Sequence, residues 1–361
     1  MTDTRRIIGC MSGTSMDAID VALVDVAGRG YQLRAQPVRC HTQPLQGLAA
    51  ELRALAEQRP ATTAAISRLA HDLAIAHVVA VRSLLGGERA DLIAVHGQTI
   101  YHAPPLGWQL MQPAPIARAF GVPVVFDLRS ADLAAGGQGA PITPLADAIL
   151  FRHAARSRAV VNLGGFCNVT LLPRGAEIDA RAIEAGDVCA CNQILDAIAR
   201  ALLDRPFDRD GAWAASGQAI APAFTELVRA LLDQSSAGRS LGTGDELCDW
   251  LDRHASRHAG ADLARTACAA IAQAIAQRAQ TSDEVLLAGG GARNRTLLGE
   301  LRARLPAPVV LTEEIGIPGA YREAIEMAIL GALAQDRVPI TLPRVTRVSA
   351  AAPQSGCWVL P

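Results

Sequence analysis

A polar stretch near the N-terminus, G-T-S-M-D-A-I-D, holds residue types that could bind a phosphate and a metal ion. Gly13 permits a positive φ or a close approach of the backbone to a ligand. Thr14 and Ser15 add hydroxyl groups beside the backbone N–H groups of the turn, a combination that forms a concave anion site. Asp17 and Asp20 supply carboxylates, which hold Mg²⁺ directly or through water. The stretch suits a nucleotide with Mg²⁺, but an ordinary polar β-turn in which Asp17 bonds its own loop would use the same residues.

Two apolar runs flank this stretch, at residues 7–11 and 19–24, and the second alternates as a β-strand does. We therefore predict a β-hairpin with the polar stretch at its tip. A second hairpin is predicted at residues 160–170, V-V-N-L-G-G-F-C-N-V-T, with the same order of apolar strand, glycine turn and returning strand. Two such hairpins indicate a duplicated architecture instead of a single nucleotide-binding unit.

A run of three glycines lies towards the C-terminus. The apolar residues 284–288 predict a buried strand, and G-G-G-A-R-N follows it directly before a predicted helix. Glycines in this position allow a close approach of the backbone, typically to a nucleotide. Their spacing differs from that of the dinucleotide fingerprint, so a Rossmann dehydrogenase is disfavoured.

Polar residues also follow two other predicted strands. Residues 91–95 lead into His96, and residues 122–126 lead into D-L-R, which ends at Arg129. Open α/β sheets bind ligands at such strand ends. The next loop, A-A-G-G-Q-G-A-P at residues 134–141, has too many glycines for a helix or strand and too little serine or charge for a linker. We expect it to be a binding loop or a hinge.

Helices complete the predicted framework, and their apolar periodicity places them at residues 45–58, 62–85, 192–203, 262–279 and 321–334. Asn192 is expected to cap the third of them. His71 and His77, on the second, are expected to be structural, since their spacing is wrong for a shared zinc ion on one helix face.

Length and composition limit the class of protein. The chain has 361 residues, half of them apolar and 19% charged, which is typical of a soluble protein with two domains. A net charge of −1 leaves no basic surplus for binding a nucleic acid. No apolar run of transmembrane length and no signal peptide is found, so we expect a cytoplasmic protein without a membrane partner.

The chain contains no lysine, so all 34 basic residues are arginines. This excludes a Walker A loop, a Schiff-base enzyme and the strand lysine of protein kinases. Phosphate chemistry must then use backbone amides, hydroxyls, arginine and a metal ion. The eight cysteines lack C-x-x-C spacing and are predicted to be small buried apolar residues. For Cys189 and Cys191, a redox role is the alternative.

Several motifs together resemble those of the anhydro-N-acetylmuramic acid kinases. They are G-x-M-S-G-T-S-M-D-x-I-D, V-H-G-Q-T, A-A-G-G-Q-G-A-P, N-L-G-G-x-x-N-x-T, D-x-D-G-A-x-A-x-x-G, G-G-G-A-x-N and G-I-P-G-x-x-x-E-A. The resemblance implies the α/β fold of the actin, sugar-kinase and heat-shock-chaperone superfamily, in which two ribonuclease-H-like domains hold ATP in an interdomain cleft. We expect the first domain at residues 1–130 and 338–361, and the second at residues 131–337.

The resemblance also implies an activity. Such kinases use ATP, with Mg²⁺, and water to open the 1,6-anhydro ring of anhydro-N-acetylmuramic acid and to phosphorylate O6. The product, N-acetylmuramic acid 6-phosphate, is an intermediate of cell-wall recycling. The partners implied are therefore an anhydro amino sugar and ATP, and the expected assembly is a homodimer.

Site residues follow from the same resemblance. Asp187 stands where the family has its general base, a role that suits a carboxylate within reach of the attacking water. Mg²⁺ is assigned to Asp17 or Asp20. The implied substrate-binding residues are His96, Arg129, Asp132, Gln138 and Glu323, with Arg129 placed to hold the lactyl carboxylate bidentately. The implied ATP-binding residues are Gly13, Thr14, Ser15, Met16, Asp17, Ala18, Ile19, Asp20, Asn162, Gly164, Gly165, Gly289, Gly290, Gly291 and Asn294.

The chain departs from the family pattern in three places. The family's F-D-T-G-P-G-N reads G-D-V-C-A-C-N at residues 186–192, its P-K-S-T-G-R-E reads G-R-S-L-G-T-G at residues 238–244, and its V-T-G-A reads V-T-R-V at residues 345–348. Without the family's glycines, the segment after Asp187 is expected to form a loop of altered conformation. Two alternatives therefore stay open: a kinase for another anhydro sugar such as levoglucosan, and a weakly active sensor of nucleotide or sugar.

Overall fold

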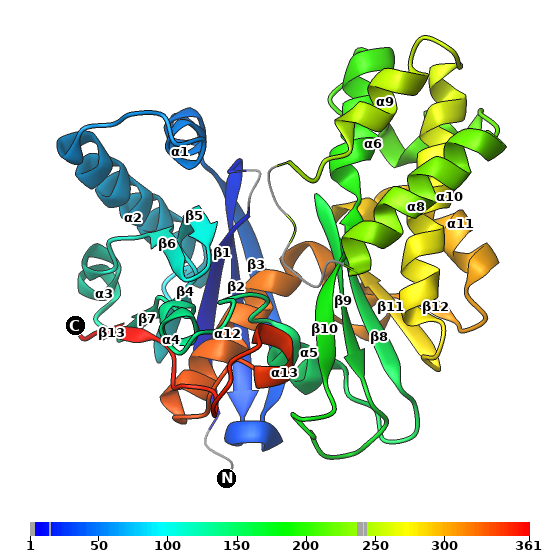
Figure 1. Ribbon diagram of the computed structural model, residues 1–361. Helices are drawn as coiled ribbons and strands as arrows, with labels where there is room; N and C mark the ends of the chain where they lie inside the picture. The colour runs from blue at the N-terminus through cyan, green and yellow to red at the C-terminus, as the bar shows by residue number, and fades with distance from the viewer. Residues whose placement is uncertain (1–3, 14–15, 237–240, 242–243) are drawn as a thin grey trace. The chain divides into compact units, whose positions relative to one another are not determined.

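The computed structural model describes residues 4–13, 16–236, 241 and 244–361. The chain is α/β, as expected, and it divides into two compact units (Figure 1). Unit 1 consists of Met1–Leu150, Glu177–Ile183 and Tyr321–Pro361, and unit 2 of Phe151–Ala176 and Glu184–Ala320. These boundaries differ from the predicted ones, because residues 131–150, 177–183 and 321–337 belong to unit 1. The long helix near the C-terminus packs on the first strand, a contact that local sequence patterns do not reveal.

A six-stranded sheet forms the centre of unit 1, in the order β13-β7-β4-β1-β2-β3. The strands are β1 (Arg5–Ser12), β2 (Ala18–Ala27), β3 (Arg34–Pro44), β4 (Leu92–Val95), β7 (Val124–Phe126) and β13 (Cys357–Val359). β1 and β2 form the predicted antiparallel hairpin, and β3 continues it. β4 and β7 run parallel to β1. β1 is central and apolar, and Ile7 and Ile8 are fully buried.

Unit 2 repeats this sheet order with five strands, β10-β9-β8-β11-β12. They are β8 (Arg158–Leu163), β9 (Phe166–Leu172), β10 (Glu184–Ala190), β11 (Glu284–Ala288) and β12 (Val309–Leu311). In the main sheet of both units, the first strand is central. The second strand pairs antiparallel with the first, and the third pairs antiparallel with the second. The fourth and fifth strands lie on the other side of the first strand and run parallel to it. The duplication predicted from the two hairpins is therefore confirmed.

Helices cover the two sheets. Those of unit 1 are α1 (Ala49–Ala56), α2 (Thr63–Leu85), α3 (Ala114–Phe120), α4 (Ser130–Ala134), α5 (Pro144–Phe151), α12 (Arg322–Gln335) and α13 (Pro343–Thr346). A small sheet of β5 (Gln98–Ala103) and β6 (Leu106–Leu110) also belongs to this unit. Unit 2 contains α6 (Asn192–Leu202), α7 (Ala212–Ala215), α8 (Ala221–Ser236), α9 (Cys248–His254), α10 (Gly260–Ala279) and α11 (Arg295–Arg304).

Helix α2 begins and ends as its sequence predicts. The Thr62 hydroxyl accepts a hydrogen bond from the Ala65 N–H at 3.2 Å, and Gly86 ends the helix with a φ of 56°. By length and composition alone, α2 could cross a membrane, so the expectation that no segment reaches that length is wrong. Its apolar face, including Leu73 and His77, is buried in the core of unit 1. Burial lowers the pKa of His77 to about 4, in agreement with a structural role.

Asn192 does not cap α6, contrary to the prediction. The helix begins at Asn192 itself, Cys191 is the capping residue, and neither side chain accepts a capping hydrogen bond. The Asn192 amide instead donates to the Leu163 carbonyl at 3.1 Å, tying the start of α6 to the end of β8. This tertiary contact outweighs the local capping preference.

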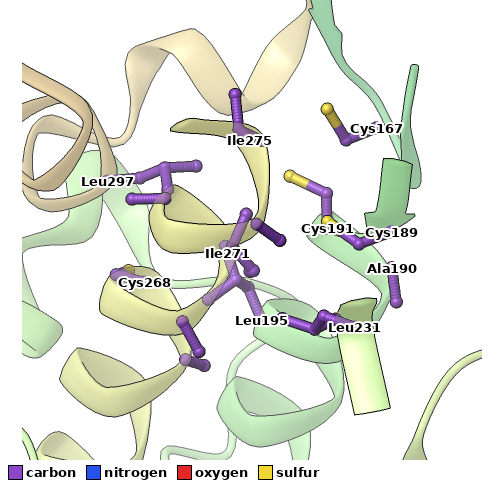
Figure 2. Packing of buried hydrophobic residues seen from close by; sticks show 14 of the residues in the cluster. Cys167, Cys189, Ala190, Cys191, Leu195, Leu231, Cys268, Ile271, Ile275 and Leu297 are labelled. Carbon is purple, nitrogen blue, oxygen red and sulfur yellow. The ribbon is translucent and has the colours of Figure 1, made fainter. Parts of the chain in front are cut away.

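The core of unit 2 is rich in sulfur (Figure 2). Cys167, Cys189 and Cys191 are buried close to α10, whose Ile271 and Ile275 belong to the same cluster. Burial raises the pKa of the Cys191 thiol well above its usual value, which keeps the thiol neutral and apolar. Across the chain, the prediction of buried cysteines is correct for Cys10, Cys167, Cys189, Cys191 and Cys268, but Cys40 is partly exposed and Cys248 and Cys357 are exposed.

Candidate active site

The tip of the first hairpin is described only in part, since Thr14 and Ser15 lie outside the described residues. The Gly13 carbonyl accepts hydrogen bonds from the Met16 N–H at 3.1 Å and from the Gln98 amide at 3.3 Å. Met16 has a φ of 55° and its side chain is buried, which turns the chain sharply into β2. Asp17 is exposed. The tip is thus held by the side chain of Gln98, the first residue of β5.

Three carboxylates gather near the start of β2. Asp20 accepts a hydrogen bond from the Thr42 hydroxyl at 2.6 Å. Burial raises the pKa of Asp20, and the negative charges of Asp17 and Glu323 raise it further. Glu323 lies in the first turn of α12. A divalent cation would relieve this mutual repulsion.

These residues are compatible with Mg²⁺. Among the described residues, no group of three or more His, Cys, Asp or Glu side chains is arranged to hold a metal ion by itself. Mg²⁺ does not need such a group, because it commonly binds one or two carboxylates together with substrate phosphates. Asp17 and Asp20 therefore fit the role that the sequence assigns to them, as ligands shared with a nucleotide.

Arg129 and His96 form the centre of a second group in unit 1. Arg129 follows β7, and its Nε donates to Nε2 of His96 at 3.0 Å. The other ring nitrogen of His96, Nδ1, lies 2.8 Å from the Gly97 carbonyl. Nδ1 must therefore carry the proton, and the ring is neutral. One terminal nitrogen of Arg129 donates to the Gly139 carbonyl at 2.7 Å, which holds the guanidinium against the glycine-rich loop.

The charges of this group are set by burial. Burial lowers the pKa of His96 to about 3, and the positive charge of Arg129 lowers it further. Burial also lowers the pKa of Arg129 to about 10, while the carboxylates of Glu323 and Asp132 oppose that shift. At neutral pH the site thus presents a charged guanidinium beside a neutral imidazole, an arrangement suited to an anionic group on a ligand.

Asp132 does not fit the predicted role of a substrate ligand. Its side chain is fully buried. One carboxylate oxygen accepts from the Gly139 N–H at 2.8 Å and the other from the Thr346 hydroxyl at 2.8 Å. Gln138 is held at the same place through its backbone, whose N–H donates to the Thr346 carbonyl at 2.7 Å. Asp132 therefore anchors the glycine-rich loop.

At the third departure from the family pattern, the backbone has a conformation that favours glycine. Arg347 stands where the family has glycine, and it has a φ of 64°. A non-glycine residue in the left-handed region costs roughly 1 kcal/mol. The hydroxyl of the preceding Thr346 donates to the Asp132 carboxylate, and this contact helps to order the glycine-rich loop.

In unit 2, Asp187 lies in a row of polar residues across three strands. Asn162 of β8 is paired with Asn168 of β9, and Asn168 is paired with Asp187 of β10. Side chains of paired residues share one face of a sheet. All three are partly exposed, whereas Val161, on the next position of β8, is buried. Asn168 was not among the predicted site residues, although it is part of the quoted N-L-G-G motif.

The segment after Asp187 is not the loop that the sequence predicts. β10 continues to Ala190, with a bulge between Asp187 and Cys189. Val188 and Cys189 are fully buried and extend the strand into the core; Cys189 stands where the family has a glycine. The Asp187 carboxylate accepts a hydrogen bond from the Leu241 N–H at 2.7 Å.

The second hairpin and the glycine run have packing roles that the sequence did not reveal. The carbonyls of Gly164 and Gly165 accept hydrogen bonds from backbone N–H groups at the start of α6, between 2.9 and 3.1 Å. A Cβ on Gly289 would lie 2.6 Å from the Asn162 amide oxygen, and one on Gly291 would lie 2.8 Å from the Leu163 Cβ. These two glycines bring the loop against β8, whereas a Cβ on Gly290 would lie at ordinary contact distance, 4.0 Å from the Asn192 amide nitrogen.

A cavity of about 540 Å³ opens beside this loop. Small-molecule sites commonly measure about 300–1,000 Å³. Its lining residues come from α6, α7, α10 and the segments that precede α7 and α11: Asn192, Leu195, Asp196, Phe207, Asp208, Arg209, Asp210, Trp213, Ala214, Ala264, Cys268, Gly290, Gly291, Arg293 and Asn294. Three predicted ATP-binding residues, Gly290, Gly291 and Asn294, thus line it together.

Several cavity residues were missed by the sequence analysis. Phe207 is 50% exposed and offers an aromatic face, and Asp196 and Arg293 add opposite charges. Asp196 follows Asn192 by one helical turn, a spacing that could have indicated a shared face. Asn294, in contrast, has a structural task, since its side chain caps α11 by accepting from the Leu297 N–H at 3.0 Å.

Asp196 gives a testable pH dependence. Burial raises its pKa from 3.8 to about 6, although Arg200 lowers it. Between these values the folded state binds more protons than the unfolded state, so this group's contribution to stability is present at low pH and is lost as pH rises towards 6. Asp196→Asn should therefore raise the free energy of unfolding near neutral pH by about 1 kcal/mol, after discounting for partial exposure. Urea denaturation should show the gain vanishing below about pH 4. Asp252→Asn, on an exposed site, should show no gain at either pH.

The repeated sheet order, each copy with a glycine hairpin, defines a protein of two ribonuclease-H-like units, and the cavity of unit 2 suits a nucleoside. A family profile described as anhydro-N-acetylmuramic acid kinase matches residues 5–356, and the chain belongs to this family. The anhydro-N-acetylmuramic acid kinase of Bordetella pertussis is 38% identical over 369 residues, covering 96% of this chain and 94% of its own. That of Salinibacter ruber is 34% identical, covering 97% and 95%. A solved ROK family glucokinase from Streptomyces griseus, in complex with glucose and AMPPNP, covers 90% of this chain and 99% of its own with a TM-score of 0.42 and 14% identity.

Proposed function

We propose that the protein is an ATP-dependent kinase that opens 1,6-anhydro-N-acetylmuramic acid with water and phosphorylates O6, giving N-acetylmuramic acid 6-phosphate. Membership of the kinase family, over nearly the whole chain, carries this proposal. Two further predictions are part of the same proposal: a cytoplasmic location, which was expected from the composition, and a homodimer, which the family resemblance implies.

The proposed reaction makes two bonds and breaks two. The water oxygen bonds to the anomeric carbon as the bond from that carbon to O6 breaks. O6 then bonds to the γ-phosphorus of ATP as the bond to the β-phosphate breaks, and ADP leaves. Asp187 takes the proton that the attacking water loses. The Leu241 N–H, 2.7 Å from its carboxylate, favours the ionised form that a base requires.

Nucleotide and sugar are assigned to different residues. The adenosine is assigned to the cavity of unit 2, beside Gly290 and Phe207. The first hairpin carries Asp17 and Asp20, which we propose as ligands of Mg²⁺ bound with the ATP phosphates. Mg²⁺ supplies charge neutralisation of the transferring phosphoryl group. Arg129 is assigned to the lactyl carboxylate of the sugar.

Incubation of the purified protein with ATP, Mg²⁺ and the anhydro sugar tests this function. We expect one ADP and one 6-phosphosugar per sugar consumed, measured by a coupled ADP assay and by mass spectrometry. If levoglucosan, which lacks the lactyl acid, is turned over faster, then levoglucosan and not the anhydro amino sugar is the substrate. ATP-dependent thermal stabilisation without turnover of either sugar would contradict a kinase function and indicate a sensor.

Arg129→Lys should weaken binding of the lactyl sugar. Lysine cannot form the paired hydrogen bonds of a guanidinium with a carboxylate, and such a charged bond contributes about 1.5–3 kcal/mol. We therefore expect KM for the anhydro sugar to rise about 10- to 100-fold, with KM for ATP unchanged. Arg118→Lys, at an exposed position of α3, is the matched control. An equal loss on levoglucosan would show that Arg129 does not contact the lactyl group.

A further inference from the structure

Two hydroxyl groups form a chain of hydrogen bonds that ends at the carboxylate of Asp20. Asp20 of β2 is paired with Thr42 of the edge strand β3, so the two side chains share one face of the sheet. The Thr42 hydroxyl donates to Oδ1 of Asp20 at 2.6 Å. The hydroxyl oxygen of Tyr321, the residue directly before α12, lies 3.1 Å from that of Thr42. Three segments of unit 1 therefore meet at this carboxylate.

The direction of the chain follows from the number of protons. A carboxylate only accepts hydrogen bonds, and a threonine hydroxyl has one proton to donate. Because the Thr42 proton is donated to Asp20, the contact with Tyr321 must use the phenol proton, which is donated to the Thr42 oxygen. Tyr321 thus orients the Thr42 hydroxyl and makes it a stronger donor, since hydrogen bonds in a chain polarise one another.

The donor at Asp20 is neutral, which leaves the negative charge of the carboxylate available to a ligand. From the part of the chain that the structure describes, Asp20 forms no ion pair and accepts no hydrogen bond besides the one from Thr42. A neighbouring arginine would also fix the carboxylate, but its charge would repel a cation. A hydroxyl instead fixes Oδ1 and leaves Oδ2 to bind a divalent cation or one of its waters.

Tyr321 is placed by the buried residue that follows it. Arg322 is 2% exposed and forms an ion pair with Asp147 at 3.2 Å. This anchor fixes the beginning of α12, with Tyr321 on one side of Arg322 in the chain and Glu323 on the other. The negative charge of Glu323 also acts on Asp20. The start of α12 therefore contributes both to the orientation of the Asp20 carboxylate and to the negative charge around it.

We propose that Thr42 and Tyr321 are positioning residues for Asp20 as a ligand of the Mg²⁺ that binds with ATP. This inference deepens the proposed kinase function and rests on its assignment of Mg²⁺ to Asp20. Hydrogen-bonded partners of a metal ligand commonly contribute about 10- to 100-fold to metal affinity. The family motifs do not predict these two residues, because Thr42 lies outside them and Tyr321 occupies an unspecified position of G-I-P-G-x-x-x-E-A.

Two conservative variants test the chain. Thr42→Val removes the hydroxyl and keeps a branched side chain that suits a β-strand. Tyr321→Phe removes only the phenol oxygen. Thr225→Val on α8 and Tyr31→Phe, both at exposed positions, are the matched controls.

Calorimetry with a non-hydrolysable ATP analogue measures the effect without turnover. The Kd of the analogue is determined once with Mg²⁺ and once with EDTA, and the ratio of the two values reports the contribution of the metal ion. We expect Thr42→Val to raise Kd about 10-fold in Mg²⁺ and to leave Kd in EDTA within about twofold. Tyr321→Phe should raise Kd in Mg²⁺ about threefold, because it acts through Thr42. An equal change in both media, or no change in Mg²⁺, would overturn the proposal.

The double variant shows whether the two hydroxyls act in series. If Tyr321 acts only through Thr42, Tyr321→Phe has no further effect on the Kd in Mg²⁺ when it is added to Thr42→Val. If the two changes in Kd multiply instead, the hydroxyls act independently and the proposed chain is wrong.

The kinase function can fail separately from this inference. If the unaltered protein phosphorylates no anhydro sugar, but Mg²⁺ raises its affinity for the analogue and Thr42→Val reduces that gain, the kinase proposal is overturned and the role of the two hydroxyls is supported. If the unaltered protein binds the analogue equally well in Mg²⁺ and in EDTA, Asp20 holds no cation and this inference fails, whether or not the sugar is phosphorylated.

Discussion

Asp187→Asn is expected to lower kcat about 10²- to 10⁴-fold, the range of a lost general base. The amide cannot take the proton from the attacking water. The substitution nearly preserves the volume and leaves an oxygen that can accept from the Leu241 N–H, so the fold should be unchanged. Rapid-quench measurement of phosphosugar formation, with saturating ATP and sugar, would report the chemical step directly.

Two controls make this result specific. Glu184→Gln changes a carboxylate to an amide on the same strand, at an exposed position beside Arg278, and should retain activity. Affinity for ATP, measured by calorimetry, should be the same for Asp187→Asn and the unaltered protein. An Asp187→Asn enzyme with normal turnover would show that another group accepts the proton, and the proposed mechanism would then be wrong.

Arg322→Met is expected to have the largest effect on stability, about 3–5 kcal/mol in the free energy of unfolding. Arg322, near the start of α12, is 2% exposed. It forms ion pairs with Asp147, at 3.2 Å, and with Glu326, both fully buried. Removing the guanidinium would leave two buried carboxyl groups without their cation. Arg278→Met, which removes a partly exposed arginine 3.6 Å from a carboxylate, should change stability by less than about 1 kcal/mol.

The effect of Arg322→Met should depend on pH. Burial raises the pKa of Glu326 well above its usual value, although Arg322 opposes this shift. A carboxyl group with a raised folded-state pKa contributes stability that is present at low pH and is lost as pH rises through that value. Without Arg322, the raised pKa should rise further, so the variant should lose most stability near pH 8 and least near about pH 4. Urea denaturation at both pH values tests this, and an equal loss at both would contradict a charge-based cause.

Local patterns in the sequence were enough to predict the two hairpins, the duplication and several of the helices. Each of these patterns involves only a few neighbouring residues. They are the alternation of apolar residues in β2, the threonine and glycine at the two ends of α2, and the glycine turn after β8. The same holds for the family motifs, whose residues are close together in the chain. Short-range steric and hydrogen-bonding preferences can be predicted from the sequence because each depends only on neighbouring residues.

Contacts between distant segments decided the rest. Asp132 is close in sequence to the glycine-rich loop, but its second partner, Thr346, lies near the C-terminus, and this pairing makes Asp132 a buried anchor. Phe207 and Asp196 share a cavity only because the helices of unit 2 pack as they do. The start of α6 is likewise set by β8, since Asn192 bonds Leu163 instead of capping its own helix.

The sequence by itself therefore determined the class of fold, the family and the identity of the candidate base, Asp187. It could not determine the conformation around that base. Residues 188–190 form the end of a strand because their apolar side chains are buried in a core built from other helices. The N–H that binds Asp187 comes from Leu241, which is distant in sequence from β10. Tertiary packing decided this geometry because the free energy of burying the segment exceeds the preference of its residues for any local turn.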